Sequence, residues 1–475
     1  MSVRLQLDGT ENQHAQDRLV VAVALILGIL SAIALPSLTY DSWAWMVWAR
    51  ELASFALDES GGPVMKPLPV ILTAPLAPFG DLGPIAWMSL VRTSYLLTGW
   101  IGWRIGLRLG GPAAGAIAAV GLLALPGFFT TAVQGYSEPV FILLSLVAVL
   151  CLLDGRAGWA LIALSAAGLL RSEEWPILLL VAAWAAATGR VGWKAAVTLA
   201  FAPVVIWVGI DWVASGDPMR SLNHAAGGRG RTPGEAIDHL IDDLGPLTVI
   251  GAAIASALAI RERNRAIGLM LATGVIWVAL IIGKGLAGYP IGARYLIPGA
   301  ALLMVCAAWG VARVLHTTLR PQLRLATGTL LVCVILSWGA ASQFRETVRM
   351  ASNQVKAGQA LDHAIREAGG RKRLGSLSGP TVMANTPLMT ELAWRLGVPL
   401  RKVTTVWKRH PNDQISAPAV IFIAPAGLTG RISPLPERFS VNRIGSASPW
   451  TIYSISDRRA TGDRQARLPS RTSAP

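Results

Sequence analysis

The chain has 475 residues, of which 53% are hydrophobic and only 15% are charged. A soluble globular domain carries about 25% charged residues, so this composition excludes a purely soluble protein and indicates a membrane protein. The net charge of +15 does not indicate nucleic-acid binding, because the basic residues are scattered through short loops and form no stripe.

Eleven apolar segments follow one another along the chain, each near the length of about 20 residues that a membrane span needs. They lie near 19–37, 84–103, 112–131, 138–153, 158–170, 175–189, 195–214, 246–260, 266–284, 292–312 and 325–343. The first is interpreted as a retained signal anchor, with cleavage after Ala34 as the alternative. The pattern predicts an all-α polytopic membrane protein.

The basic residues of the connecting loops predict the orientation of these spans. The N-terminal residues 1–18 and every second loop hold thirteen basic and five acidic residues, whereas the opposite loops hold eight basic and thirteen acidic ones. Lys and Arg accumulate on the cytoplasmic side, so we expect a cytoplasmic N-terminus in the plasma membrane. Eleven spans then place the C-terminal domain on the extracytoplasmic side.

The large first outer loop, residues 38–83, begins with a predicted amphipathic helix. Four large apolar side chains recur there at helical spacing: Trp45, Trp48, Leu52 and Phe55. This is the pattern of a helix that lies in the plane of the membrane interface. Asp41 stands in its first turn, at the mouth of the first span. Asp41 is interpreted either as a helix N-cap or as a general base held at the membrane surface.

Later in the same loop, glycines and prolines flank Lys66. They predict a turn that presents this lysine just before the chain re-enters the membrane. Lys66 is interpreted either as an interfacial anchor whose amine reaches to water or as a point charge for a phosphate.

Two further outer loops are short and charged. Tyr136 and Glu138 lie between the third and fourth spans, where the dipole of the following helix alone would explain the carboxylate. Arg171 and Glu173 are packed between two short spans. Ionisable residues at that depth predict an internal ion pair or the wall of a pocket.

The last outer loop ends at Arg294 and Tyr295, where the tenth span begins, and Lys284 stands at the end of the ninth. An arginine there can donate two parallel hydrogen bonds to a phosphate. The outer loops thus combine carboxylates with cations at the membrane surface. That combination suits a substrate with a lipid tail and a phosphate head, such as a polyprenyl-phosphate sugar.

At these residues the chain resembles the GT-C superfamily of membrane glycosyltransferases, close to the aminoarabinose transferases and the protein O-mannosyltransferases. The resemblance is carried by Asp41, Lys66-Pro67-Leu68-Pro69, Ser137-Glu138, Arg171-Ser172-Glu173 and Arg294-Tyr295-Leu296-Ile297-Pro298. It covers most of residues 15–343. The order of the motifs and the predicted topology both fit that superfamily.

The resemblance implies an enzyme that moves a sugar from a polyprenyl-phosphate donor to a hydroxyl of a glycan, lipid or protein acceptor on the extracytoplasmic face, with inversion. Asp41 would be the base, with Glu138 as second candidate. The donor phosphate would bind Lys66, Arg171 and Arg294, and Glu173, Tyr295 and Tyr136 would line the substrate pocket. The resemblance implies no required cofactor and no metal site, with a divalent metal at Asp41 and Glu138 as the alternative.

The C-terminal part has the composition of an ordinary polar domain. Residues 19–343 are interpreted as the catalytic membrane module and residues 344–457 as a small α/β domain, followed by a disordered tail at 458–475. Helices are predicted at 359–367 and 390–396, and strands at 419–424 and 450–455. Capping of the active face and recognition of the acceptor are the two roles that we expect for this domain.

A transporter or flippase of a lipid-linked or anionic substrate is the main alternative function. It would be expected to carry an inverted repeat with broken helices near the midplane of the membrane. The sequence contains no recognisable internal repeat, and its ionisable residues gather at the ends of spans. A silent scaffold is the second alternative, and it would place no demand on Asp41.

Overall fold

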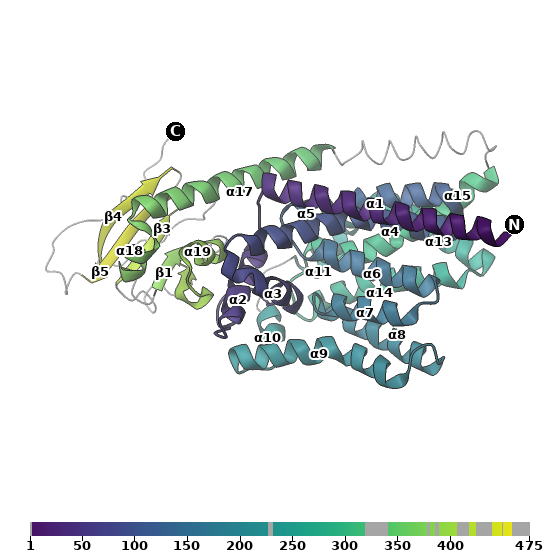
Figure 1. Cartoon of the computed structure of the whole chain (residues 1–475), viewed down its shortest axis with the longest axis horizontal. Coiled ribbons are helices and arrows are strands. Elements are labelled where there is room, and N and C mark those ends of the chain that lie inside the picture. Colours follow the sequence, from purple (N-terminus) through teal and green to yellow (C-terminus); the bar gives the residue numbers. More distant parts are fainter. Residues whose placement is uncertain are drawn as a thin grey trace. The chain divides into compact units, whose positions relative to one another are not determined.

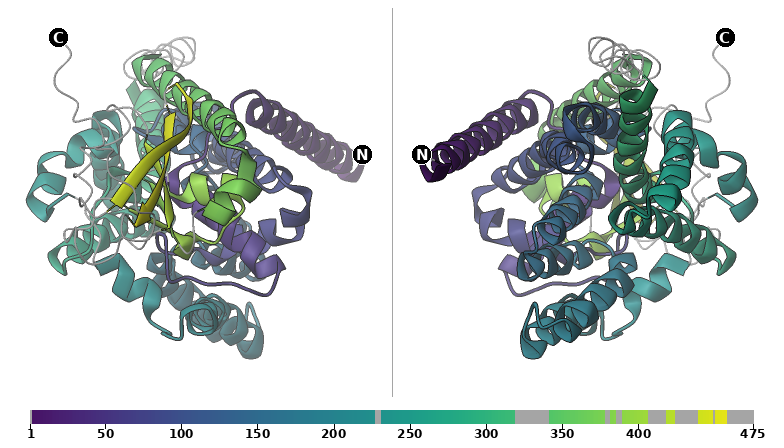
Figure 2. Two further views of the ribbon diagram at one scale, coloured as in Figure 1. Left: turned by 90° about the vertical axis from the view of Figure 1, so that its left-hand side faces the viewer. Right: turned by 90° about the vertical axis from the view of Figure 1, so that its right-hand side faces the viewer.

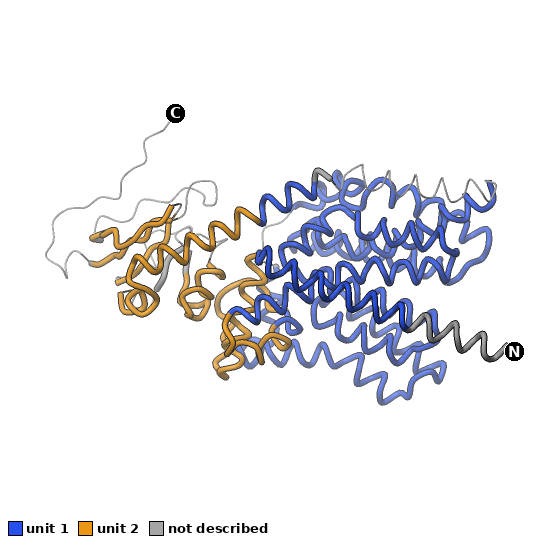
Figure 3. Tube along the Cα trace, turned by 45° about the horizontal axis from the view of Figure 1, so that its top comes forward, with its two compact units in different colours: residues 1–38, 66–69, 81–351 blue, residues 39–65, 70–80, 352–475 orange. Residues whose placement is uncertain are grey.

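The computed structural model describes residues 2–226, 231–318, 341–377, 381–384, 389–405, 418–423, 439–448 and 450–457. They are mostly helical (Figure 1). Contacts between residues group the chain into two compact units (Figure 3). Unit 1 comprises residues 1–38, 66–69 and 81–351, and unit 2 comprises residues 39–65, 70–80 and 352–475.

Unit 1 is a bundle of helices, many of which are seen nearly end-on in Figure 2. The helices, in chain order, are α1 (Ser2–Ala34), α4 (Leu82–Leu123), α5 (Phe128–Val133), α6 (Glu138–Leu153), α7 (Ala157–Gly168), α8 (Trp175–Ala187), α9 (Trp193–Ser215), α10 (Arg220–Ala226), α11 (Pro233–Asp238), α12 (Leu240–Leu244), α13 (Pro246–Glu262), α14 (Arg265–Leu286) and α15 (Ile297–Thr318). Helix α3 (Pro67–Thr73) begins in unit 1, and α17 (Ala341–Glu367) continues from unit 1 into unit 2.

Several of these helices can cross a membrane, so the predicted polytopic fold is confirmed. Five are long and apolar enough: Ala15–Ala34, Leu82–Leu123, Trp193–Ser215, Arg265–Leu286 and Ile297–Thr318. Helices α6 and α7 are apolar but shorter. The predicted total of eleven spans stays a prediction, and most of the eleventh, at 325–343, lies outside the described residues.

Helix α4 contains the span that the sequence predicts at 84–103 and most of the one predicted at 112–131. Its backbone leaves the helical conformation at Gly111, where φ is 82°, a value that glycine adopts without steric cost. Beyond this turn the chain folds back on itself: a Cβ on Gly106 would lie 2.5 Å from the carbonyl oxygen of Ala114, and one on Gly102 would meet Leu122. The 42-residue helix is therefore a tight helical hairpin.

Arg92 lies well inside the second predicted span, and its side chain ties three helices of unit 1 together. Its guanidinium donates to the carbonyl oxygens of Ser31, Leu35 and Val133, the last two at 2.7 and 2.8 Å. These carbonyls lie at the C-terminal ends of α1 and α5, where the last oxygens of a helix run short of helical donors and can accept from a side chain. The buried charge thus holds the first span against the loop that follows α5.

Unit 2 joins the first long loop to the C-terminal segment. Its elements are α2 (Tyr40–Ala53), the 3-10 helix η1 (Ala74–Phe79), α18 (Gly370–Leu377), β1 (Thr381–Ala384), α19 (Met389–Leu396), η6 (Leu400–Lys402), β2 (Val403–Thr405), β3 (Ala419–Ile423), β4 (Phe439–Ala447) and β5 (Trp450–Asp457). The strands form one sheet in the order β2-β1-β3-β5-β4. Strand β1 pairs in parallel with β2 and β3, and β5 pairs antiparallel with β3 and β4.

The predicted α/β character of the C-terminal segment is confirmed. Strands β3 and β5 occupy the two predicted strand positions, and the predicted helices correspond to the end of α17 and to α19. The boundaries predicted for the domains stay predictions, and the tail at 458–475 lies outside the described residues.

The prediction that α2 lies in the membrane interface on its tryptophans is wrong. Trp45 and Trp48 are fully buried, and α2 packs against α19 and η1. The indole N–H of Trp48 donates to the carbonyl oxygen of Asp58 at 3.1 Å. The apolar face of α2 is therefore covered by protein. Phe55, just beyond its C-terminal end, is by contrast 99% exposed.

Candidate functional site

The turn before α6 is held in one conformation by close packing. Gly135 has a φ of 71°, and a Cβ there would lie 2.5 Å from Leu38. The indole of Trp87 donates to the carbonyl oxygen of Gly135 at 2.9 Å. Only glycine satisfies both the backbone angle and the contact. The turn fixes the direction in which Ser137 and Glu138 enter the helix.

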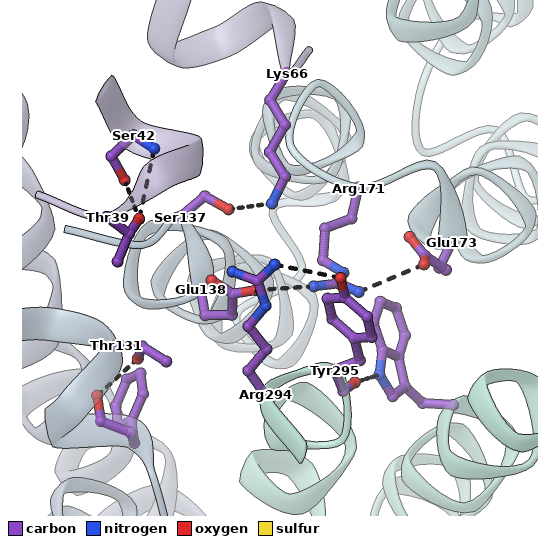
Figure 4. A network of polar contacts seen from close by, with 12 residues as sticks. Thr39, Ser42, Lys66, Thr131, Ser137, Glu138, Arg171, Glu173, Arg294 and Tyr295 are labelled. Carbon is purple, nitrogen blue, oxygen red and sulfur yellow. Dashed lines mark hydrogen bonds and ion pairs between the residues drawn. The ribbon is translucent and has the colours of Figure 1, made fainter. Parts of the chain in front are cut away.

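Glu138 and Arg171 form a buried ion pair at the ends of two helices. Glu138 is the first residue of α6 and is fully buried, and Arg171 lies between α7 and α8 and is 4% exposed. The Arg171 Nη1 lies 3.1 Å from the Glu138 Oε1, and its Nη2 lies 3.4 Å from the Glu173 Oε1 (Figure 4). The guanidinium thus bridges two carboxylates, as the short charged loop predicts.

Glu173 receives a second cation from α14. The amine of Lys284, in the last turn of that helix, lies 2.9 Å from the Glu173 Oε1. Burial alone would raise the pKa of Glu173, but the charges of Arg171 and Lys284 lower it to about 2. Burial, together with the charge of Glu173, raises the pKa of the neighbouring Glu174 to about 8. The two adjacent carboxyls are therefore shifted in opposite directions, and the cations favour the charged form of Glu173.

Arg294 lies among aromatic rings at the start of α15. Its guanidinium carbon lies 4.3 Å from the ring centre of Tyr136 and 5.1 Å from that of Tyr295. The Arg294 Nε approaches the Glu138 Oε1 only to 4.0 Å, and the arginine is 26% exposed. Aromatic faces attract such a cation and do not neutralise its charge.

Tyr295 also holds Arg171 in place. Its ring centre lies 4.6 Å from the Arg171 guanidinium carbon, and the ring of Trp277 lies at 5.9 Å. The indole N–H of Trp277 donates to the carbonyl oxygen of Tyr295 at 2.9 Å. The rings of Trp277, in α14, and of Tyr295, just before α15, therefore lie on the arginine and hold it in place.

Lys66 approaches the same region from the start of α3. Its amine donates to the hydroxyl of Ser137, which precedes Glu138 (Figure 4). The backbone N–H of Leu68 donates to the carbonyl oxygen of Leu169 at 3.3 Å. These contacts fix the re-entering chain beside the loop that carries Arg171.

We call these six ionic side chains the charged cluster: Lys66, Glu138, Arg171, Glu173, Lys284 and Arg294. The cluster brings four cations and two carboxylates together. It lies at the ends of α6, α7, α14 and α15, where apolar helices meet loops. Several partly buried cations gathered in one place favour a bound anion.

Asp41 lies in unit 2, whereas the charged cluster belongs to unit 1. It is half-buried in the first turn of α2. The N-cap of that helix is Thr39, whose hydroxyl accepts from the backbone N–H of Ser42. The interpretation of Asp41 as the N-cap is therefore wrong.

No group of three or more metal-ligating side chains occurs in the part of the chain that the structure describes. The suggested divalent metal at Asp41 and Glu138 therefore stays an untested alternative. The charged cluster instead has the donor set of an anion site, because lysine and arginine offer hydrogen-bond donors and no acceptor.

Most side chains proposed from the sequence gather in one place. Lys66, Glu138, Arg171, Glu173 and Arg294 lie in the charged cluster, and Tyr136 and Tyr295 contact its arginines. Their roles stay proposals. The sequence pattern places Lys284 only at the end of a span and does not predict its pairing with Glu173. The sequence signal that could have indicated this role is the position of Lys284 in the last turn of an apolar helix, shortly before Arg294 in the chain.

Comparison with solved structures finds the same fold elsewhere. The structure of ArnT from Cupriavidus metallidurans bound to undecaprenyl phosphate is 17% identical, with a TM-score of 0.57 over 93% of this chain and 98% of that one. The apo structure of the same protein is 16% identical, with the same TM-score and coverage. The fold that the GT-C resemblance implies is thereby confirmed. No family model and no curated protein sequence matches the chain.

Proposed function

We propose that this protein is a membrane glycosyltransferase that takes a sugar from a polyprenyl-phosphate donor and transfers it to an acceptor hydroxyl. The observation that carries the proposal is the charged cluster, which gathers four cations at the ends of apolar helices. An apolar bundle suits the polyprenyl tail, and the cluster suits its phosphate. The similar fold of ArnT, whose structure holds undecaprenyl phosphate, supports the same substrate class.

The donor phosphate would bind chiefly to Lys66 and Arg294. The Lys66 amine donates to the hydroxyl of Ser137, and the Arg294 Nε lies 4.0 Å from the Glu138 Oε1. Both cations therefore stand at the same end of α6, where a phosphate could meet them together. Arginine can grip two phosphate oxygens at once, and lysine adds a compact charge.

The transfer step uses these cations to stabilise the leaving group. The acceptor oxygen attacks the anomeric carbon, and Asp41 takes the hydroxyl proton. As the new glycosidic bond forms, the bond between the anomeric carbon and the phosphate oxygen breaks, and its electron pair stays on the phosphate. The product is polyprenyl phosphate, whose added negative charge is met by the cations. A single displacement inverts the anomeric centre.

Glu138 is the weaker candidate for the base. It is fully buried, and its Oε1 is paired with Arg171. A carboxylate that is held by an arginine gives up this pairing when it accepts a proton. We therefore assign Glu138 the role of positioning Arg171 and Arg294, and Asp41 the role of base.

The reaction is proposed to take place on the extracytoplasmic face of the plasma membrane. The excess of basic residues in the alternate loops supports this orientation, because the charged cluster lies in the opposite set of loops. The acceptor would be a glycan, lipid or protein hydroxyl. The proposed step requires no cofactor, since side-chain cations meet the charge of the leaving phosphate.

A reconstitution experiment separates this function from transport. Purified protein in vesicles is supplied with undecaprenyl-phosphate sugars and candidate acceptors, and the lipids are followed by mass spectrometry. The proposal predicts release of undecaprenyl phosphate together with a glycosylated acceptor. Movement of the intact lipid-linked sugar between leaflets, without any change in its mass, would instead support a flippase and overturn the proposal.

A further inference from the structure

Arg171 is held by two buried carboxylates, although its buried Nε has no hydrogen-bond partner among the described residues. Its two terminal nitrogens bind Glu138 and Glu173, and the rings of Tyr295 and Trp277 lie beside its guanidinium. The side chain is 4% exposed. Turning it toward a phosphate would leave two buried carboxylates without their shared partner, which is strongly unfavourable.

Lys284 differs from Arg171 both in its ion pairs and in its exposure. Its described ion pair is with Glu173, and it is 34% exposed. Its amine also lies 5.3 Å from the ring centre of Tyr289. A lysine amine on a flexible stem can change partner by rotation of its side chain. Departure of Lys284 would leave Glu173 with a cation, because Arg171 contacts the same Oε1 atom at 3.4 Å.

From this difference we propose that Lys284 is a further phosphate-binding residue and that Arg171 is a positioning residue. The inference rests on the proposed function and refines its site. When the lipid phosphate arrives, Lys284 exchanges Glu173 for a phosphate oxygen, and Arg171 keeps both glutamates in place. Glu173 is thus the internal counter-ion that competes with the phosphate for Lys284.

The test is the affinity of the full-length protein in detergent for undecaprenyl phosphate. Lys284→Gln removes the charge, and we expect affinity to fall roughly tenfold or more, as for the loss of a charged hydrogen bond. Lys284→Arg keeps the charge and should recover most of the affinity. Lys194→Gln is the matched control, because Lys194 also stands beside an aromatic ring, Trp193 at 5.9 Å; it should bind as the wild type does.

A second variant separates substrate binding from a purely structural ion pair. Glu173→Gln removes the competitor and leaves Lys284 in place, so affinity for undecaprenyl phosphate should stay equal to that of the wild type or rise. If the pair served only the fold, Glu173→Gln and Lys284→Gln would weaken binding alike. That result would overturn the inference, as would wild-type affinity in Lys284→Gln.

Two ligand controls identify the source of the phosphate. Undecaprenol, which lacks the phosphate, should bind to wild type and Lys284→Gln equally. Inorganic phosphate should compete only weakly if the tail contributes to binding; strong competition by inorganic phosphate would show that Lys284 serves a free anion. Failure of the wild type to bind undecaprenyl phosphate would overturn the proposed function itself, whereas wild-type binding with an unaffected Lys284→Gln would overturn only the role of Lys284.

Discussion

Charged side chains that are buried or partly buried have different kinds of partner in the two units. In unit 2, Arg395 pairs with Glu391 and Asp362. Arg50 donates to the carbonyl oxygens of Trp394 and Val398, at 3.3 and 2.8 Å. Each of these cations has its partners within the unit.

The charged cluster of unit 1 is built differently, because it gathers four cations beside two carboxylates. Lys66 donates to the hydroxyl of Ser137, and Arg294 contacts the ring of Tyr136 and lies 4.0 Å from the Glu138 Oε1. A balanced network stabilises a fold, whereas a network with a surplus of one charge is suited to a ligand of the other. The predictions below test this distinction, from the largest expected effect to the smallest.

Removal of the proposed base should have the largest effect. Asp41→Asn should lower sugar transfer by roughly 100- to 10,000-fold, the usual contribution of a general base, with little change in undecaprenyl phosphate binding. Transfer is measured by release of undecaprenyl phosphate from the donor. Asp217→Asn, at a half-buried aspartate in a loop of unit 1, is the control. Full transfer in Asp41→Asn would refute the assignment.

Removal of the bridging arginine should chiefly affect stability. Arg171→Met should destabilise unit 1 by about 3–5 kcal/mol, because Glu138 and Glu173 lose their shared partner. Thermal unfolding in detergent measures the loss. Unchanged stability, with binding alone reduced, would make Arg171 a direct phosphate ligand.

Arg50, which joins α2 to α19, should affect the stability of unit 2 alone. Arg50→Ala should destabilise that unit by about 2 kcal/mol, because three carbonyl oxygens lose a charged donor. Arg401→Ala breaks a surface pair with Asp58 and should cost less than about 1 kcal/mol. Unfolding followed by tryptophan fluorescence compares the two variants. Equal losses would contradict the account of unit 2.

Glu51 should give unit 2 a pH dependence. Burial raises its pKa to about 7, although the backbone N–H groups of Asp58 and Leu400 act against this shift. Because the pKa is raised on folding, the stabilisation is complete below the ordinary value of 4.5 and is lost as pH rises to about 7. Glu51→Gln should remove this part of the slope in unfolding measured from pH 4 to 8. An unchanged slope would contradict the prediction.

A chelator should have the smallest effect. Because lysine and arginine side chains meet the phosphate charge in the proposed step, EDTA should leave the rate of transfer unchanged. Loss of transfer, with recovery on addition of Mg²⁺ or Mn²⁺, would instead favour the alternative of a metal at Asp41 and Glu138.

The sequence patterns predict where most helices lie and which loop ends carry charged residues. Ionisable residues are costly in apolar surroundings, so Arg171 and Glu173 were recognisable as partners from their position alone. The pairing of Lys284 with Glu173 joins residues that are 111 positions apart. Residues so far apart share no local sequence pattern. Their pairing becomes evident only when α14 packs beside the loop that follows α7.

The environment of α2 was not predictable from its periodicity. Apolar residues at helical spacing show that one face is hidden from water, but they do not say whether lipid or protein covers it. The partner of that face is α19, which lies more than 300 residues away in the sequence. The partners of Arg92 were also hidden, because they are backbone carbonyls that carry no sequence signature.

The central claim is that the charged cluster of unit 1 binds the phosphate of a lipid. A structure of the full-length protein with undecaprenyl phosphate tests it most directly. The account predicts phosphate oxygens within hydrogen-bonding distance of Lys66 and Arg294, with Arg171 still bound to Glu138 and Glu173. A phosphate bound away from Lys66 and Arg294 would contradict it.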